Sequence, residues 1–208
     1  MINKQDFFQM LSKYENDVAN FLLSRHEKFI LVKGVKFIGK TSIIYNIFER
    51  EFDFSIIYHT GCDPTKRQQA NGEFLKILKK YEGKNCLVVM DEYYHNDIVN
   101  YLLNHDNFKS ILFVNNKELK IDNAVSFYVN EVYEEYKKHF FKDDKFDWKY
   151  KNIREIVFML DNPQFNNQQF IENQEKYENL RGVSNVTQTI VKHKGKVDIY
   201  KIEFGENQ

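Results

Sequence analysis

The hydrophobic pattern of this chain changes period several times, and each change predicts a new element. Residues 4–24 carry apolar side chains at helical spacing, which predicts one or two amphipathic helices. An apolar run at 29–32 predicts a strand, and short apolar or β-branched runs then alternate with helical patterns up to residue 130. Further strands are predicted at 54–59, 86–90, 110–114 and 125–129, and further helices at 41–50, 71–81 and 97–103.

The alternation of strands and helices predicts the fold class. The strand at 86–90 is wholly apolar, as expected for a strand that is buried on both faces of a parallel sheet. We therefore predict an α/β fold in which a parallel five-stranded sheet is flanked by helices.

The pattern becomes helical and charged after residue 131. Helices are predicted at 132–141, 153–160 and 164–180, and a β-hairpin at 186–204. The predicted domains are a core at 1–130, a helical lid-like region at 131–182 and a C-terminal β-hairpin extension at 183–208.

The spacing of two glycines gives the first chemical signal. Residues 34–41 fit the phosphate-loop pattern G-x-x-x-x-G-K-[ST], between a predicted strand and a predicted helix. Gly34 and Gly39 let backbone N–H groups approach phosphate oxygens. Lys40 can then reach the terminal phosphates, and Thr41 can offer its hydroxyl to Mg²⁺. The core is therefore predicted to be a P-loop domain that binds a nucleoside triphosphate.

Polar side chains follow two of the buried strands. Asp91 and Glu92 end the strand at 86–90 and form an acidic Walker B pattern. We assign Asp91 to Mg²⁺, and Glu92 to the attacking water as general base. Asn115 follows the strand at 110–114 and is predicted to orient that water and sense the γ-phosphate, because catalytic groups gather at the carboxyl ends of parallel strands. Asn116 is the alternative for this role.

Composition narrows the classes of function. The 30 basic and 30 acidic residues cancel, so the net charge favours neither nucleic acid nor membrane as a partner. No apolar run approaches the ~20 residues of a membrane span. Two cysteines and the lack of a signal-like apolar block predict a cytoplasmic protein. The abundance of Asn, Lys, Phe, Tyr and Ile is typical of an AT-rich genome and points to a low-GC bacterium or one of its phages.

With these motifs in place, residues 20–160 resemble the AAA+ ATPases. In that resemblance, 34–41 is the Walker A motif, Asp91 and Glu92 belong to Walker B, and Asn115 is sensor 1. The resemblance implies that ATP and Mg²⁺ are the cofactors and that the chain works within an oligomer.

Two further segments look most like clamp-loader subunits. One is the run from Gly39 to Ser42, which adds Ser42 to the cofactor-binding residues. The other is 152–160, which resembles a lid helix whose arginine touches the γ-phosphate. Arg154 matches that arginine, the sensor 2 residue of the family.

The chain departs from the clamp-loader pattern in two places. Those subunits carry a Ser-Arg-Cys arginine finger before the fifth strand, and residues 117–125 contain no arginine. Arg67, Arg181, Lys120 or another protein would have to supply the cation. The stretch 141–153 is also too short for a full lid, which leaves a minimal phage-type relative, a helicase loader or a signalling-type P-loop ATPase open.

We predict a Mg²⁺-dependent ATPase that acts as a subunit of a homo- or hetero-oligomer in DNA replication, with DNA or replication proteins as partners. Lys40, Glu92, Asn115 and Arg154 are its predicted catalytic residues. A viral DNA-packaging ATPase and a nucleotide-binding adaptor without turnover are alternatives. A nucleotide kinase is disfavoured, because arginines for an Arg-rich lid are few.

Overall fold

The structure is a computed structural model that describes residues 3–50, 52–60, 66–91, 95–115, 118–141, 152–161 and 186–203. Its helices are α1 (Lys4–Ser24), α2 (Lys40–Phe48), α3 (Arg67–Lys80), α4 (Asn96–Asn104), α5 (Val129–Phe140) and α6 (Ile153–Asp161). Its strands are β1 (Phe29–Lys33), β2 (Phe54–Thr60), β3 (Cys86–Asp91), β4 (Phe108–Val114), β5 (Val125–Tyr128), β6 (Val186–His193) and β7 (Lys196–Glu203).

All of these strands form one mixed sheet in the order β5-β1-β4-β3-β2-β6-β7. Strands β1 to β5 run parallel, whereas β6 pairs antiparallel with β2 and β7 antiparallel with β6. The α/β fold class is confirmed, and the arrangement is consistent with a P-loop-like domain.

The predicted extent of the sheet is wrong. We expected five parallel strands and a hairpin outside them, but the sheet has seven strands because the hairpin continues it. Ile57 of β2 pairs with Ile190 of β6, so backbone groups along the outer side of β2 are satisfied by the hairpin. Sequence periodicity predicts the hairpin but carries no signal for the strand that it joins.

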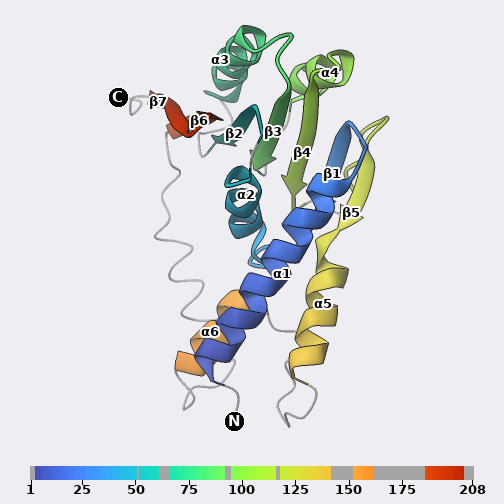
Figure 1. Cartoon of the computed structure of the whole chain (residues 1–208), viewed down its shortest axis with the longest axis vertical. Coiled ribbons are helices and arrows are strands. Elements are labelled where there is room, and N and C mark those ends of the chain that lie inside the picture. The colour runs from blue at the N-terminus through green and yellow to red at the C-terminus, as the bar shows by residue number, and fades with distance from the viewer. Residues whose placement is uncertain are drawn as a thin grey trace.

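Helices cover both faces of the sheet, and each face has its own apolar core. Alternate residues of the strands, such as Val32, Val89 and Phe113, pack with α1, α2, α5 and α6. The residues between them, such as Val88 and Leu112, pack with α3 and α4. Figure 1 shows α1 as one long helix beside α5, with α3 and α4 together at the opposite end of the view. Segment 4–24 is therefore a single helix.

Several element boundaries differ from the predicted ones. Helix α3 starts at Arg67, earlier than the predicted residue 71, and α5 starts at Val129, directly after β5. The predicted helix at 164–180 lies outside the described residues. Within the part of the chain that the structure describes, no helix is both long and apolar enough to cross a membrane.

Candidate nucleotide-binding site

The predicted phosphate loop connects β1 to α2, as its pattern requires. The loop leaves the sheet at Gly34, whose N–H donates to the carbonyl of Val114 at 3.0 Å. A methyl group on Gly34 would lie 2.5 Å from Cγ1 of Val129 and 2.6 Å from Cδ1 of Ile38. Glycine is needed here because the start of α5 packs directly on the loop.

The second glycine turns the loop into the helix. Gly39 caps α2 with φ of 81°, a left-handed conformation that other residues adopt only with strain. A methyl group on Gly39 would also lie 3.0 Å from Oε1 of Glu15 and 3.3 Å from Cδ1 of Ile153. The loop therefore lies between the first β-strand, α1 and α6.

Lys40, the first residue of α2, is 5% exposed. Its ammonium group donates to the carbonyl of Val35 at 2.7 Å and, more weakly, to that of Gly34 at 3.3 Å. It also donates to Oδ1 of Asn115 at 2.6 Å. These acceptors offset the cost of removing a charge from water and hold the side chain against the loop. The structure thus brings together two of the predicted site residues, Lys40 and Asn115.

Strand register places Asp91 on the same face as these groups. Asp91 pairs with Phe113, and Asn115 lies two residues beyond Phe113. Because side chains alternate along a strand, Asp91 and Asn115 continue the rows that pack under α1 and α2. Lys40 enters from α2 on this face, so the carboxylate, the amide and the ammonium group face one end of the sheet.

His59 is a residue of this region that the sequence analysis missed. It occupies the position on β2 that pairs with Asp91 on β3. Its Nδ1 lies 3.2 Å from Oδ2 of Asp91, whose side chain is 6% exposed. The sequence predicts the strand at 54–59, but only the strand order shows that its last residue lies beside Asp91.

Asn130 at the start of α5 was also missed. Its Oδ1 accepts a hydrogen bond of 2.9 Å from the N–H of Val35. This contact fixes the first half of the loop against α5. A polar residue directly after the predicted strand at 125–129 was the available signal.

Helix α6 reaches the loop through two contacts with Phe37. The N–H of Ile153 donates to the carbonyl of Phe37 at 3.1 Å. The guanidinium carbon of Arg154 lies 3.8 Å from the centre of the Phe37 ring, within the range of a cation–π contact. Phe37 itself has φ of 64°, in the left-handed region. The predicted sensor 2 residue therefore lies at the phosphate loop, far from it in sequence.

The structure describes some of the remaining predicted site residues and not others. Thr41 and Ser42 are exposed in the first turn of α2, where free N–H groups and the helix dipole favour an anion. Glu92, Asn116 and Arg181 lie outside the described residues. Their roles stay predictions.

No group of three or more His, Cys, Asp or Glu side chains suited to a metal ion occurs within the described ranges. Mg²⁺ rarely needs such a cage, because it is usually held by one or two carboxylates, water and substrate phosphates. The buried carboxylate of Asp91 and the hydroxyl of Thr41 fit that donor set.

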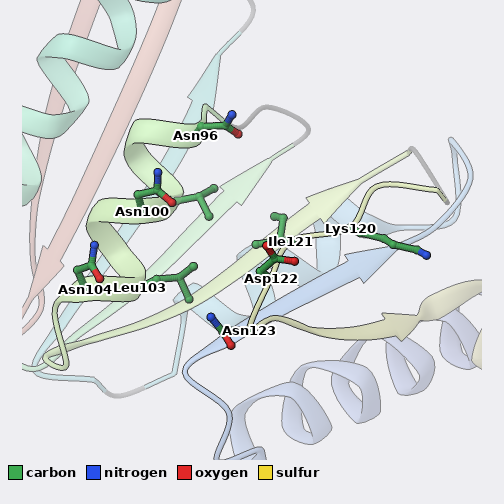
Figure 2. Close-up of a pocket in the computed structure, with 9 residues that line it drawn as sticks. Asn96, Asn100, Leu103, Asn104, Lys120, Ile121, Asp122 and Asn123 are labelled. Atoms are coloured by element: carbon green, nitrogen blue, oxygen red, sulfur yellow. The ribbon is translucent and has the colours of Figure 1, made fainter.

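A separate cavity of 510 Å³ lies between α4 and residues 120–123. Figure 2 shows the amide side chains of Asn96, Asn100 and Asn104 in a row along one side of it. Lys120, one of the predicted alternatives to an arginine finger, lines this cavity and is exposed. The cavity shares no lining residue with the phosphate loop.

Comparisons with known proteins add little to this geometry. No protein-family model matches the chain, and no curated protein matches it. Among solved structures, the chain is similar to C. elegans PCH-2, with 18% sequence identity and a TM-score of 0.37. The match covers 61% of this chain and 42% of that chain. The chain thus spans less than half of the PCH-2 chain, and the match does not decide family or function.

Proposed function

We propose that this protein binds ATP with Mg²⁺ and hydrolyses it, as an ATPase of the AAA+ type. The observation that carries the proposal is the 2.6 Å hydrogen bond from Lys40 of the phosphate loop to Asn115 at the end of β4. A lysine cation beneath a glycine-bounded loop can neutralise a γ-phosphate, and a strand-end amide in contact with it can orient the attacking water.

Each side chain has a separate task in this proposal. Lys40 neutralises charge on the terminal phosphates, and the N-terminal end of α2 holds phosphate oxygens through backbone N–H groups. Asp91 and Thr41 would hold Mg²⁺, which when bound screens the negative charge of the β- and γ-phosphates. His59 keeps the Asp91 carboxylate in place through its 3.2 Å contact.

Hydrolysis needs a base for the attacking water. We assign this role to Glu92, which accepts the proton while the water oxygen bonds to the γ-phosphorus and ADP leaves. Asn115 orients the water, and Arg154 contacts the γ-phosphate after leaving the Phe37 ring. The release of Arg154 from Phe37 would couple nucleotide binding to the position of α6.

A finer proposal is that the chain is a clamp-loader-like or helicase-loader-like oligomer subunit in DNA replication. It is supported by the position of Arg154 at the loop, which is where a sensor 2 residue is needed. ATP turnover that rises on addition of primed DNA, and a mass in solution that grows with an ATP analogue, would support this finer role.

The core proposal is tested by measuring ADP formation from ATP and Mg²⁺ by the purified protein. We expect turnover by the parent protein, none by Lys40→Ala because nucleotide binding fails, and none by Glu92→Gln although binding persists. Lys79→Ala, an exposed lysine on α3, is the matched control and should keep the parent rate. Binding that survives in Lys40→Ala would contradict the assignment of the phosphate loop.

A further inference from the structure

A carboxylate that belongs to no predicted motif lies beside the phosphate loop. Glu15, in the middle of α1, is half-buried, and its Oε1 lies 3.0 Å from the position that a methyl group on Gly39 would occupy. The hydroxyl of Ser42, on the neighbouring turn of α2, interacts with this carboxylate. Burial raises the pKa of Glu15 above its usual value, and the nearby hydroxyl of Ser42 offsets part of the rise.

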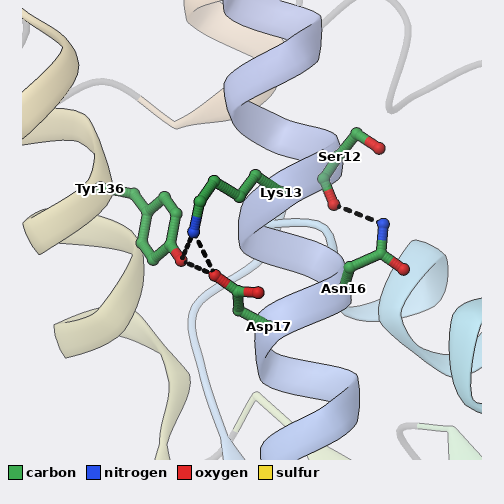
Figure 3. A network of polar contacts seen from close by, with 5 residues as sticks. All are labelled: Ser12, Lys13, Asn16, Asp17 and Tyr136. Carbon is green, nitrogen blue, oxygen red and sulfur yellow. Dashed lines mark hydrogen bonds and ion pairs between the residues drawn. The ribbon is translucent and has the colours of Figure 1, made fainter.

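The position of Glu15 is fixed by its neighbours on α1. Lys13 forms an ion pair of 2.6 Å with Asp17, and both side chains contact the hydroxyl of Tyr136 on α5 (Figure 3). Asn16, the residue after Glu15, accepts at its Oδ1 a hydrogen bond of 3.1 Å from Arg50, which lies just beyond the end of α2. These contacts link α1 to α5 and to the end of α2, so Glu15 is held over the loop.

Glu15 and Lys40 mark two different ends of the proposed site. Lys40 points toward Asn115, where the terminal phosphates belong. Glu15 contacts Ser42, two residues further along α2, and lies near Ile153 of α6. If the phosphates run from Lys40 along the loop toward Ser42, as the proposed function requires, the ribose after the last phosphate lies beside Glu15.

The chemistry of a carboxylate decides what it can bind there. An ionised carboxylate only accepts hydrogen bonds, and it repels phosphate oxygens. Glu15 thus opposes binding of the polyphosphate alone and favours a neighbour that carries N–H or O–H donors. In a nucleotide, the ribose hydroxyls and the exocyclic amine of the base are such donors.

We propose that Glu15 is a specificity-determining residue that recognises the nucleoside part of the bound nucleotide by accepting a hydrogen bond from it. This inference rests on the proposed function, because it assumes that the loop holds the phosphates. It adds that the site selects a nucleoside triphosphate over other polyphosphates through one charged side chain on α1.

The test compares the affinities of ATP and inorganic tripolyphosphate for the parent protein and for Glu15→Gln by calorimetry with Mg²⁺. The glutamine keeps the shape of the side chain and can still accept from Ser42, but it lacks the charge. We expect the affinity for ATP to fall about five- to tenfold, since a charged acceptor is replaced by a neutral one. The affinity for tripolyphosphate should stay the same or rise, because a repulsive charge is removed.

A lower affinity for ATP together with an unchanged or higher affinity for tripolyphosphate distinguishes the loss of nucleoside recognition from damage to the phosphate loop. A misplaced loop would weaken both ligands in parallel, and that result, like an unchanged ratio of the two affinities, would overturn the proposal. Glu73→Gln removes an exposed carboxylate on α3 and should leave both affinities unchanged. Thermal unfolding of each variant checks that the fold is retained.

Three further nucleotides identify the donor. If the ribose is recognised, 2′-deoxy-ATP or 3′-deoxy-ATP binds the parent protein more weakly than ATP, and this difference disappears in Glu15→Gln. If the base is recognised, inosine triphosphate behaves in that way instead. Either result supports the proposal, whereas differences that persist in Glu15→Gln contradict it. Failure of the proposed function gives a different result. In that case Lys40→Ala would have the same affinity as the parent protein, both for ATP and for tripolyphosphate.

Discussion

Nδ1 of His59 lies 3.2 Å from Oδ2 of Asp91, across two strands whose register pairs these residues. The imidazole is 57% exposed, whereas the carboxylate is 6% exposed. A side chain at the surface thus orients a buried acid at the end of β3. Replacing a group that orients a metal-binding carboxylate typically lowers metal affinity by about 10- to 100-fold.

Replacing His59 with alanine should weaken the binding of Mg²⁺ more than it weakens the binding of nucleotide in the absence of metal. We expect the Mg²⁺ concentration for half-maximal ATP hydrolysis to rise about tenfold, because Asp91 loses its positioning contact. His139→Ala, an exposed histidine on α5, is the control. An unchanged Mg²⁺ dependence in His59→Ala would show that the contact has no role in metal binding.

Asn115→Ala removes one side-chain acceptor of Lys40. Lys40 keeps two loop carbonyls, so ATP affinity should change by no more than about threefold. Turnover should fall at least about tenfold, because the group that we propose to orient the attacking water is lost. Steady-state hydrolysis and equilibrium binding measure the two effects. Asn100→Ala, in the amide row of α4, should leave both at parent values.

The contact between Arg154 and Phe37 predicts that lysine cannot replace this arginine. A guanidinium stacks on an aromatic ring over its whole plane, whereas an ammonium group is a compact charge. We expect Arg154→Ala and Arg154→Lys both to bind ATP and to hydrolyse it at least about tenfold more slowly. Arg25→Ala, at the end of α1, serves as control. Full activity in Arg154→Lys would mean that charge alone suffices.

Gly39 and Gly72 provide a matched pair for the loop. Gly39→Ala forces alanine into a left-handed conformation beside Glu15 and Ile153, which should lower the free energy of unfolding by about 1–2 kcal/mol and weaken ATP binding. A methyl group on Gly72 meets nothing within 4 Å in α3. Gly72→Ala should therefore stabilise the protein by up to about 1 kcal/mol. Urea unfolding measures both values, and equal effects of the two substitutions would refute the strain at Gly39.

Local patterns predict the loop and its immediate surroundings well. The glycine spacing and the buried strand before it predict the turn from β1 into α2, and the structure shows both elements. Asn115 was predicted to lie at the γ-phosphate, which Lys40 is also predicted to reach, because parallel strands end at one edge of a sheet, and the structure places the two side chains in contact. In these cases, one rule links neighbouring residues to a position in space.

Contacts between distant segments could not be predicted in the same way. Glu15, His59 and Phe37 are ordinary residues of a helix, a strand and a loop in the sequence. Their importance depends on the packing of α1 and α6 on the loop and on the pairing of β2 with β3. The mixed sheet was missed for the same reason, since the sequence pattern of a hairpin does not show which strand the hairpin will pair with.

The position of the C-terminal hairpin also sets an order for folding. Every parallel strand precedes Val129, so these strands can pair while β6 is still to be synthesised. During that interval, the outer edge of β2 has no partner, and an open edge can pair with other chains. Addition of β6 and β7 moves the open edge to β7, where Lys196, Asp198 and Lys201 place charges that oppose such pairing. The hairpin thus covers an edge of β2 that the earlier part of the chain leaves open, and it puts a strand with charged side chains in its place.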